Sequence, residues 1–251
     1  MKEELLHIGP VTIYGYGLMI AIGVVACYLV MEYRARKLGM KEEKVLGLVF
    51  SCVLGGFLGA KVLYFITEFS DIVKNPSLLL NLSDGFVVYG GILGGIFVGY
   101  LYCRFQKLKF LEYFDLAMPS VALAQGFGRI GCFLAGCCYG VETEEGFGIT
   151  FHNSSFAPNG VPLFPTQLVS SALDFLHFGI LLWVSGKKKA DGQVAACYLI
   201  FYSLGRFILE FFRGDLIRGS VGALSTSQFI SIFTFLGGCL LVWICARRKT
   251  R

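Results

Sequence analysis

One stretch of the chain joins residue types that are costly to bury with types that let backbones approach closely. Residues 126–140 hold one arginine, five glycines and three cysteines inside a long apolar run. A charged side chain at bilayer depth costs about 2.5–3.5 kcal/mol even on a lenient scale, and the guanidinium of Arg129 cannot lose its charge. Glycines allow backbone or ligand to come close. The stretch predicts a buried, positively charged pocket for an anionic group.

A second charged group follows at helical spacing. Arg206, Glu210 and Arg213 stand at i, i+4 and i+7, which places them on one helix face. Glu210 could simply neutralise Arg206, but two buried arginines, Arg129 and Arg206, exceed one glutamate. The spare positive charge predicts a bound anion. Arginine offers paired donors to phosphate oxygens, so the prediction is a phosphate, and in a membrane a phospholipid head group.

Other polar side chains in apolar runs allow two interpretations each. Tyr16, Tyr89 and Tyr139 could donate phenolic hydrogen bonds near the glycine-rich stretches, or anchor the chain at the membrane interface. Asp174 and His177 lie three residues apart, so they could form a structural hydrogen bond or a proton relay.

The cysteines form one cluster among otherwise single residues. Most of the nine fall alone in apolar spans, where free cysteine behaves as a small hydrophobe. Cys132, Cys137 and Cys138 could pack, form an external disulfide or redox site, or bind a metal. Their spacing lacks a standard zinc pattern. The three interpretations stay open at this point.

The composition identifies the class of protein. The chain has 251 residues, of which 55% are hydrophobic and 16% charged, whereas a soluble domain has about a quarter charged. This is typical of an integral membrane protein. The net charge of +5 comes from short basic clusters beside apolar runs, and no zinc-finger or RNA-binding motif occurs, so a nucleic-acid partner is excluded.

Hydropathy predicts an all-α integral membrane protein with about seven transmembrane helices in one bundle. Each span needs about 20 mostly apolar residues. No linker or long repeat divides the chain, so residues 1–251 are expected to form a single polytopic membrane domain. The predicted spans are about 11–31, 45–66, 86–103, 111–138, 165–184, 192–212 and 224–246.

Lysine and arginine positions predict the orientation. Fifteen basic residues lie in the first, third and fifth connections and the C-terminal tail, and four lie on the opposite side. The side rich in Lys and Arg is expected in the cytoplasm. The N-terminus is then outside, the C-terminus is cytoplasmic, and the polar loop 141–164 is outside.

The second and third spans contain small residues at four-residue spacing, including Gly55, Gly59, Gly90 and Gly94. Such residues let membrane helices touch backbone to backbone. Lys61 lies beside them, where it could have a functional role or could extend to the interface.

Pro165, Thr166 and Gln167 open the fifth span. Proline suits the first turn of a helix. Thr166 is expected to cap that helix, and Gln167 is expected to face the outer mouth of the pocket.

Six short motifs follow one another along most of the chain. They are Tyr16-Gly17-Leu18-Met19, Tyr89-Gly90-Gly91, Gly128-Arg129-Ile130-Gly131, Pro165-Thr166-Gln167-Leu168, Arg206 to Arg213, and Leu224-Ser225-Thr226-Ser227-Gln228. No single motif is specific, but the six in this order resemble the prolipoprotein diacylglyceryl transferase family.

The resemblance implies a transferase of lipoprotein biosynthesis. The diacylglyceryl group of phosphatidylglycerol would pass to the cysteine thiol of a prolipoprotein signal peptide, and glycerol-1-phosphate would leave. No metal or other cofactor is implied, and the location would be the bacterial cytoplasmic membrane, with the active site toward the external leaflet. The implied catalytic residues are Arg129, Arg206, Glu210 and Tyr89. The implied substrate-binding residues are Arg129, Tyr16, Gly90, Gly91, Gly128, Gly131, Gly140, Gln167 and Arg213.

The chain departs from the family pattern at three positions. Tyr89, Cys132 and Cys137 stand where the family commonly has His, Asn and Glu. One alternative is therefore a relative that transfers a lipid-derived group to another acceptor. Another is a transporter or lipid-binding protein whose arginines bind an anion, although the chain lacks the inverted repeat of common transporters.

Overall fold

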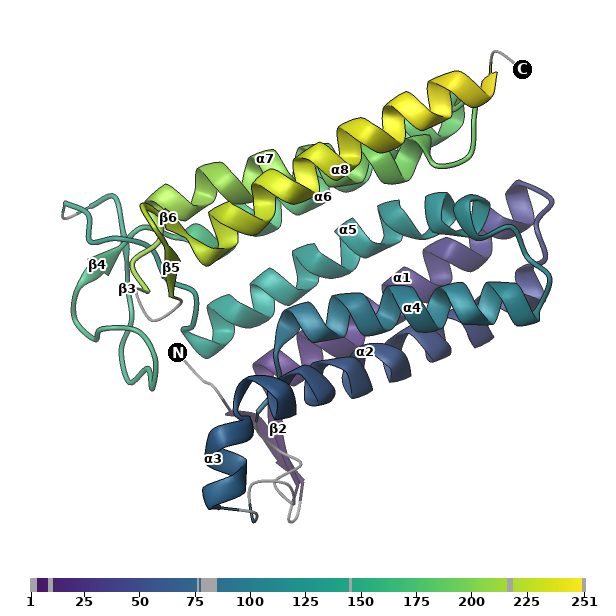
Figure 1. The fold of residues 1–251 in the computed structure, drawn as a ribbon. Helices are drawn as coiled ribbons and strands as arrows, with labels where there is room; N and C mark the ends of the chain where they lie inside the picture. Colours follow the sequence, from purple (N-terminus) through teal and green to yellow (C-terminus); the bar gives the residue numbers. More distant parts are fainter. Residues whose placement is uncertain are drawn as a thin grey trace. The chain divides into compact units, whose positions relative to one another are not determined.

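The computed structural model describes residues 4–8, 11–75, 77, 85–144, 146–215 and 219–249. Long helices dominate the fold (Figure 1). The helices are α1 (Gly15–Lys37), α2 (Val45–Thr67), α3 (Phe69–Lys74), α4 (Val88–Phe105), α5 (Phe110–Ala135), α6 (Thr166–Lys187), α7 (Gln193–Leu209) and α8 (Thr226–Lys249), with 3₁₀ turns η1 (Glu42–Lys44) and η3 (Glu210–Phe212). Short antiparallel pairs join β1 (Glu4–Ile8) to β2 (Val11–Tyr14), β3 (Ile149–Thr150) to β4 (Pro162–Leu163), and β5 (Ser220–Val221) to β6 (Leu224–Ser225).

The helices confirm an all-α integral membrane protein. Among the described residues, six helical segments are long and apolar enough to cross a membrane: those containing α1, α2, α4, α6, α7 and α8. The seventh long helix, α5, has 26 residues and carries Glu112, Asp115 and Arg129. Long helices therefore lie at all seven predicted spans, and the one that is not among these six contains Arg129.

The first helix begins later than expected. The predicted span started near residue 11, but Val11–Tyr14 form β2 and pair with β1, so that Ile8 faces Val11. Three of these four residues, Val11, Thr12 and Ile13, are β-branched and favour strands over helices. Helix α1 starts at Gly15.

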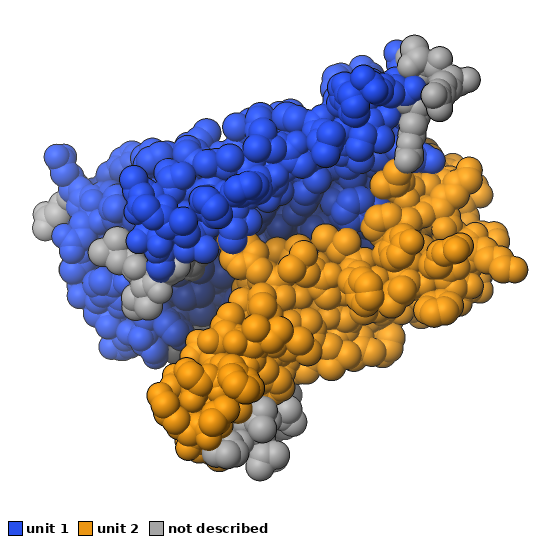
Figure 2. Space-filling view, viewed as in Figure 1, with its two compact units in different colours: residues 1–31, 114–251 blue, residues 32–113 orange. Residues whose placement is uncertain are grey.

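The chain folds into two compact units, each coloured separately in Figure 2. Unit 1 contains residues 1–31 and 114–251, and unit 2 contains residues 32–113. Each has internal packing that its own sequence explains.

Unit 2 is built on the contact between α2 and α4. A Cβ added at Gly59 would clash with the carbonyl oxygen of Gly90 and lie 2.8 Å from the Cα of Gly94. A Cβ at Gly55 would lie 2.6 Å from the side chain of Val98. Only glycine permits this approach of two helix backbones, which explains the small-residue spacing.

Lys61 is buried in unit 2 and does not reach water as a surface lysine would. Its side chain is only 7% exposed. Its ammonium lies 4.9 Å from the ring centroid of Phe86, 5.1 Å from that of Tyr64 and 5.4 Å from that of Phe65. Cation–π attraction to these rings offsets part of the cost of burying the charge. The interface interpretation was therefore wrong.

The core of unit 1 lies among α5, α6, α7 and α8. Met118, Leu181, Val194 and Tyr198 are buried together, and α7 lies alongside α8 (Figure 1). At the other end of α5, the hydroxyl of Ser171 donates to the carbonyl of Gly126 at 2.9 Å. These contacts hold α6 and α7 against the helix that carries Arg129.

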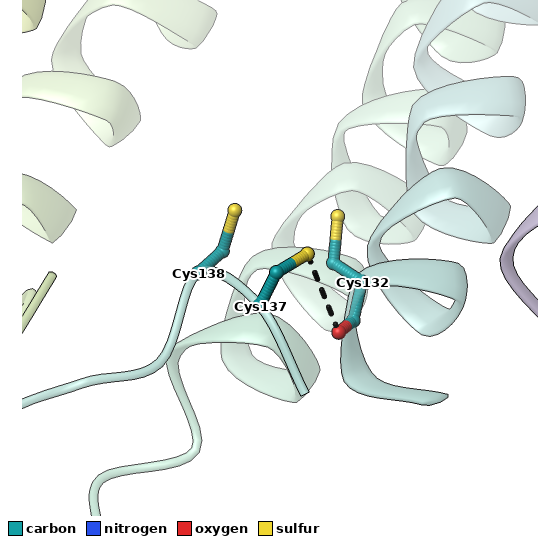
Figure 3. Close-up of side chains that lie close together, drawn as sticks. All are labelled: Cys132, Cys137 and Cys138. Atoms are coloured by element: carbon teal, nitrogen blue, oxygen red, sulfur yellow. Dashed lines mark hydrogen bonds between the residues drawn. The ribbon is translucent and has the colours of Figure 1, made fainter. Parts of the chain in front are cut away.

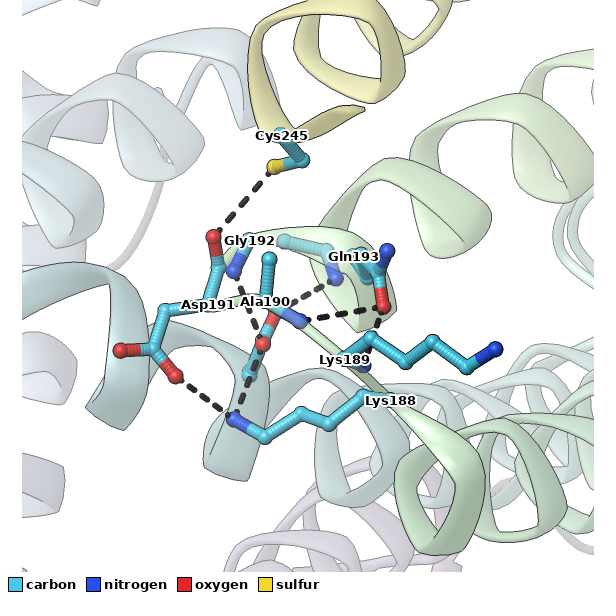
Figure 4. Close-up of polar contacts among 9 residues, drawn as sticks. Lys188, Lys189, Ala190, Asp191, Gly192, Gln193 and Cys245 are labelled. Carbon is cyan, nitrogen blue, oxygen red and sulfur yellow. Dashed lines mark hydrogen bonds and ion pairs between the residues drawn. The ribbon is translucent and has the colours of Figure 1, made fainter. Parts of the chain in front are cut away.

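A buried carboxylate holds the start of α7. The Asp115 side chain is 1% exposed and accepts hydrogen bonds from the backbone N–H groups of Gly192 and Ala195, each at 2.9 Å. A helix start leaves such N–H groups without partners, so Asp115 of α5 caps α7 from another helix. Lys188 donates to Asp115 and to Asp191, both at 3.1 Å, as Figure 4 shows for Asp191.

Two further contacts hold the connection between α6 and α7. Gln193 accepts hydrogen bonds from the backbone N–H groups of Lys189 and Ala190, and the thiol of Cys245 in α8 donates to the carbonyl of Asp191 (Figure 4). Burial acts to lower the pKa of Lys188, but the Asp115 carboxylate raises it, and the pKa ends above its ordinary value. Lys188 is therefore charged at neutral pH.

Replacing Asp115 by alanine should destabilise unit 1. Asp115→Ala leaves two buried N–H groups and the Lys188 ammonium without this acceptor, at a cost of about 3 kcal/mol or more. The midpoint of thermal unfolding in detergent should fall by roughly 6–12 °C. The control is Asp71→Ala, which removes an exposed pair with Lys74 and should have little effect. Equal midpoints for the two variants would contradict the capping role.

Gly59→Ala tests the contact of α2 with α4. The new methyl group meets backbone atoms, which cannot move aside as a side chain can, so the cost should be about 1–3 kcal/mol. Gly237→Ala is the control, since a Cβ there has no neighbour within 4 Å among the described residues. It should be neutral or slightly stabilising, because glycine is unfavourable inside a helix. Thermal unfolding in detergent distinguishes the two outcomes.

Candidate functional site

A cavity of about 190 Å³ in unit 1 has walls from α5, α6 and α7. Its polar wall contains Arg129, Asp174, His177, Tyr202 and Arg206. The other lining residues are mostly apolar: Ser170, Leu173, Leu176, Ile180, Phe201, Gly205 and Leu209. The two arginines that the sequence singled out therefore line one cavity, although 77 positions separate them in the chain.

Arg129 has a counter-ion that its sequence neighbours did not reveal. The Nε of Arg129 lies 4.0 Å from Oδ2 of Asp174. The expectation of one glutamate against two arginines was thus wrong, because a second carboxylate faces the same cavity. Asp174 lies on α6, 45 residues further along the chain, so local spacing could not show the pair.

His177 does not form the structural hydrogen bond with Asp174 that their spacing allowed. Its ring stacks on Tyr198, with centroids 5.2 Å apart and planes inclined by 11°. Its Nε2 is buried and has no hydrogen-bond partner among the described residues. Because His177 lines the cavity, a ligand there could meet this atom.

Arg206 is held from two sides. Its Nη2 lies 2.8 Å from Oε2 of Glu210 and donates to the hydroxyl of Ser227 at 2.8 Å. The i, i+4 pairing with Glu210 was expected from the sequence. Ser227 was not, since it lies on α8, which packs along α7. These contacts fix the guanidinium in a side chain with many rotamers.

Arg213 does not continue the helix face of Arg206 and Glu210. Helix α7 ends at Leu209, and the 3₁₀ turn Glu210–Phe212 changes the direction of the chain. Arg213 instead binds Asp215 through two hydrogen bonds of 2.8 and 2.7 Å. Burial acts to lower the pKa of Arg213, and the hydrogen bond to Asp215 raises it, so the pKa ends above its ordinary value.

Tyr202 is a cavity residue that the sequence reasoning missed. It lines the same cavity as Arg129 and Arg206. Its ring stacks on that of Tyr198 at 5.6 Å, and the Tyr198 hydroxyl donates to Gln125 at 2.9 Å. The available signal was the i, i+4 spacing of Tyr202 and Arg206, which places both on one face of α7.

Tyr16, Gly128 and Gly131 lie where α1 and α5 meet. A Cβ at Gly131 would lie 3.2 Å from the ring of Tyr16 and 3.2 Å from Met19, so close packing accounts for this glycine. A Cβ at Gly128 would meet nothing within 4 Å among the described residues. Tyr16 is 45% exposed.

Gly140, Thr166 and Gln167 join the end of α5 to the start of α6. The hydroxyl of Thr166 donates to the carbonyl of Cys138 at 2.7 Å, and Nε2 of Gln167 donates to that of Cys137 at 2.9 Å. Thr166 therefore does not cap its own helix, and Gln167 is buried, so both expectations were wrong. A Cβ at Gly140 would lie 2.5 Å from the carbonyl oxygen of Phe164.

The connection 141–164 has a small core of its own. Phe151, Ala157 and Leu163 are buried against residues that include Phe133 and Tyr139. The polar composition of this segment concealed these contacts. Tyr139 thus packs in the core of the connection.

Tyr89, Gly90 and Gly91 belong to unit 2. They form the first turns of α4, where Gly90 and Gly91 approach the backbone of Gly59 and Gly56. Helix packing accounts for both glycines. None of the three is among the residues that line the cavity of unit 1. Their implied roles in catalysis and substrate binding stay predictions.

Two arginines, one carboxylate and mostly apolar walls make an amphiphilic cavity, and comparison with known proteins agrees with this chemistry. The family model described as prolipoprotein diacylglyceryl transferase matches residues 3–244. The chain belongs to the prolipoprotein diacylglyceryl transferase family.

Named relatives cover the chain almost end to end. A protein of Clostridium tetani named phosphatidylglycerol–prolipoprotein diacylglyceryl transferase is 48% identical over 99% of this chain and 100% of its own length. A Clostridium perfringens protein of that name, numbered 2, is 48% identical over 96% of this chain and 94% of its own. A Staphylococcus aureus protein of the same name is 30% identical over 92% and 84%.

Thr166→Val tests the link between α5 and α6. Valine keeps the shape of threonine but removes the donor to the Cys138 carbonyl, at a cost of about 1–3 kcal/mol. The matched control is Thr234→Val, whose lost hydrogen bond reaches only Ile230 in the same helix. Thermal unfolding in detergent should show a clear loss for the first variant and little change for the second. A larger loss at Thr234 would refute the proposed importance of the link.

Proposed function

We propose that this chain transfers the diacylglyceryl group of phosphatidylglycerol to the cysteine thiol of a prolipoprotein signal peptide. Membership of the family and the names of relatives covering the whole chain support this activity. The structural observation that carries the proposal is the position of Arg129 and Arg206 on the walls of one cavity that is otherwise largely apolar.

A phospholipid matches the chemistry of this cavity. Guanidinium groups bind phosphate oxygens through paired, charge-assisted hydrogen bonds. Leu173, Leu176 and Ile180 of α6 and Phe201 and Leu209 of α7 offer apolar surface for the attached chains. The lipid head group would lie against the two arginines, where Tyr202 and the free Nε2 of His177 supply further polar contacts.

The reaction would be a substitution at carbon. The sulfur of the signal-peptide cysteine, as thiolate, attacks the glyceryl carbon that carries the phosphate. The carbon–oxygen bond breaks, and its electron pair leaves with glycerol-1-phosphate, while a thioether joins the diacylglyceryl group to sulfur. The thiol proton passes to water as the thiolate forms, and the phosphodiester monoanion becomes a phosphomonoester dianion, which can take that proton up, so atoms and charge balance.

The arginines would act on the leaving group. Negative charge grows on the phosphate oxygen as the bond breaks, and fixed cations in a water-poor site stabilise it without reorganising. Glu210 and Ser227 hold Arg206 in place, and Asp174 does so for Arg129. Tyr16 would contact the lipid head group, and Gly128 leaves open space beside Arg129.

The remaining implied residues have supporting roles in this proposal. Gly140 and Gln167 position the segment that joins α5 to α6, and Arg213 acts through its pair with Asp215. Tyr89, Gly90 and Gly91 keep the substrate roles that the resemblance implies. Asp174, Tyr202 and Ser227 are added to the candidate residues.

We further propose a single polytopic domain in the bacterial cytoplasmic membrane, since one family model spans both units. The charge asymmetry supports an external N-terminus and a cytoplasmic C-terminus. The basic connections then lie in the cytoplasm. Arg129, near the end of α5 furthest from its basic connection, would face the external leaflet.

Arg129→Ala should abolish transfer. The assay is thioether formation on a lipobox peptide, measured by mass in vesicles that contain phosphatidylglycerol. Loss of one cationic donor to a leaving phosphate should reduce turnover by about 10²-fold or more. The turnover of Arg129→Lys should lie between those of the wild type and Arg129→Ala, because lysine keeps the charge but not the paired donors. The control is Arg104→Ala, an exposed arginine on α4 that should keep wild-type turnover.

Normal turnover by folded Arg129→Ala would remove the central residue of the mechanism. If the wild-type protein modifies no lipobox peptide but consumes phosphatidylglycerol, the acceptor is a different molecule. If it consumes no phospholipid and passes anions across the vesicle, the transport alternative holds instead.

A further inference from the structure

Cys132, Cys137 and Cys138 bring their thiols together beside the proposed lipid site. Their three sulfur atoms all lie within 4.8 Å of one another. Figure 3 shows Cys132 at the end of α5 and Cys137 and Cys138 on the segment that follows, with all three side chains gathered. The Cys137 thiol lies 3.7 Å from the carbonyl of Cys132. All three are partly buried, so small ions can reach them.

The end of α5 is what gathers them. Gly136 has φ +74°, the left-handed conformation that commonly ends a helix. The N–H of Gly136 donates to the carbonyl of Phe133 at 3.2 Å, and that of Cys137 donates to the carbonyl of Cys132 at 3.1 Å. This pair of bonds is a Schellman cap, which turns the chain back over the last helical turn. The reversal therefore brings Cys137 next to Cys132.

Cys138 completes the group at a cost. Its φ is +61°, which is unfavourable for a residue with a side chain. The surrounding structure holds it there: its carbonyl accepts from Thr166, and the carbonyl of Cys137 accepts from Gln167. The segment is thus fixed on both sides before any ligand arrives, which lowers the cost of arranging three ligands.

Two guanidinium groups lie near the three thiols. Arg129 stands three residues before Cys132 in α5, and Arg213 forms a β-bridge with Gly140, two residues beyond Cys138. Three thiolates and a cation of charge +2 carry a net charge of −1, which a neighbouring guanidinium offsets. Cysteines that only pack in a membrane helix, such as Cys52, need no such neighbours.

A disulfide accounts for the group less well. No disulfide joins any of the nine cysteines, all of which belong to the described residues. A disulfide uses two sulfurs and leaves the third beside it, whereas a metal uses all three. Thiolates bound to one zinc ion at about 2.3 Å lie roughly 3.8 Å apart, so the observed group needs to close by only roughly 1 Å.

We propose that Cys132, Cys137 and Cys138 bind one thiophilic metal ion, Zn²⁺ or Cu⁺, through three thiolate sulfurs. Zinc would keep a fourth coordination position open to water or a substrate group, whereas Cu⁺ can be three-coordinate with soft ligands. The ion would join the last turn of α5 to the segment Cys137–Cys138, whose carbonyl groups accept hydrogen bonds from Gln167 and Thr166. The proposal rests on these residues and does not depend on the proposed transfer reaction.

The test uses the full-length protein in detergent, purified and reduced without oxygen. Zn²⁺ and Cu⁺ are added separately, excess metal is removed, and bound metal is measured by elemental analysis. One ion per chain is expected. Cys132→Ser, Cys137→Ser and Cys138→Ser should each weaken binding at least 10-fold. Cys239→Ser, which changes an exposed cysteine of α8, is the matched control and should bind as wild type does.

A second measurement needs no variant. Bound metal should protect three thiols of the wild-type protein from alkylation, located by mass spectrometry of peptides, while Cys239 still reacts. The metal that gives both stoichiometric binding and protection identifies the ion. No binding of either ion, binding unaffected by all three serine substitutions, or protection of other cysteines would overturn the proposal. So would a disulfide within the group in the anaerobic protein together with no metal uptake after reduction.

Discussion

Burial of two guanidinium groups in apolar protein is the constraint on which the site depends. Neither arginine can lose its charge, so each needs partners, and at least one partner of each comes from another helix. Arg129 of α5 faces Asp174 of α6, and Arg206 of α7 meets Glu210 and Ser227. The helices must therefore be held in register, and Asp115, which caps α7 from α5, provides one such restraint.

The strength of the two ion pairs differs in a way that suits ligand binding. Arg206 is held at 2.8 Å by two partners, which fixes its direction. The Arg129–Asp174 distance of 4.0 Å is too long for a hydrogen bond, so charge is balanced without occupying the donors of Arg129 through that contact. A carboxylate at this distance lowers the cost of burial, and the guanidinium keeps donors for an arriving phosphate. Balanced charge and binding capacity can thus coexist.

The end of α5 connects the site to the segment beyond it. A Schellman cap at Gly136 reverses the chain, and the carbonyls of Cys137 and Cys138 receive hydrogen bonds from Gln167 and Thr166. The connection 141–164 is anchored by its own buried core around Phe151. Thr166 and Gln167 therefore support this segment, and together with the cap they hold the end of α5 and the three thiols at a defined point.

The sequence alone determined the membrane class, the series of long helices and the family, and it singled out Arg129, Arg206 and Glu210 as candidate residues. Those features follow from composition, from apolar length, from ordered motifs and from i, i+4 spacing, all of which are local. Only the tertiary structure decided that Asp174 and Ser227 partner the arginines, that Tyr202 lines the cavity and that Arg213 leaves the helix face to bind Asp215. Each of these depends on where a chain turns or on contacts between distant helices. Packing of whole helices sets such contacts, and no spacing within one helix encodes them.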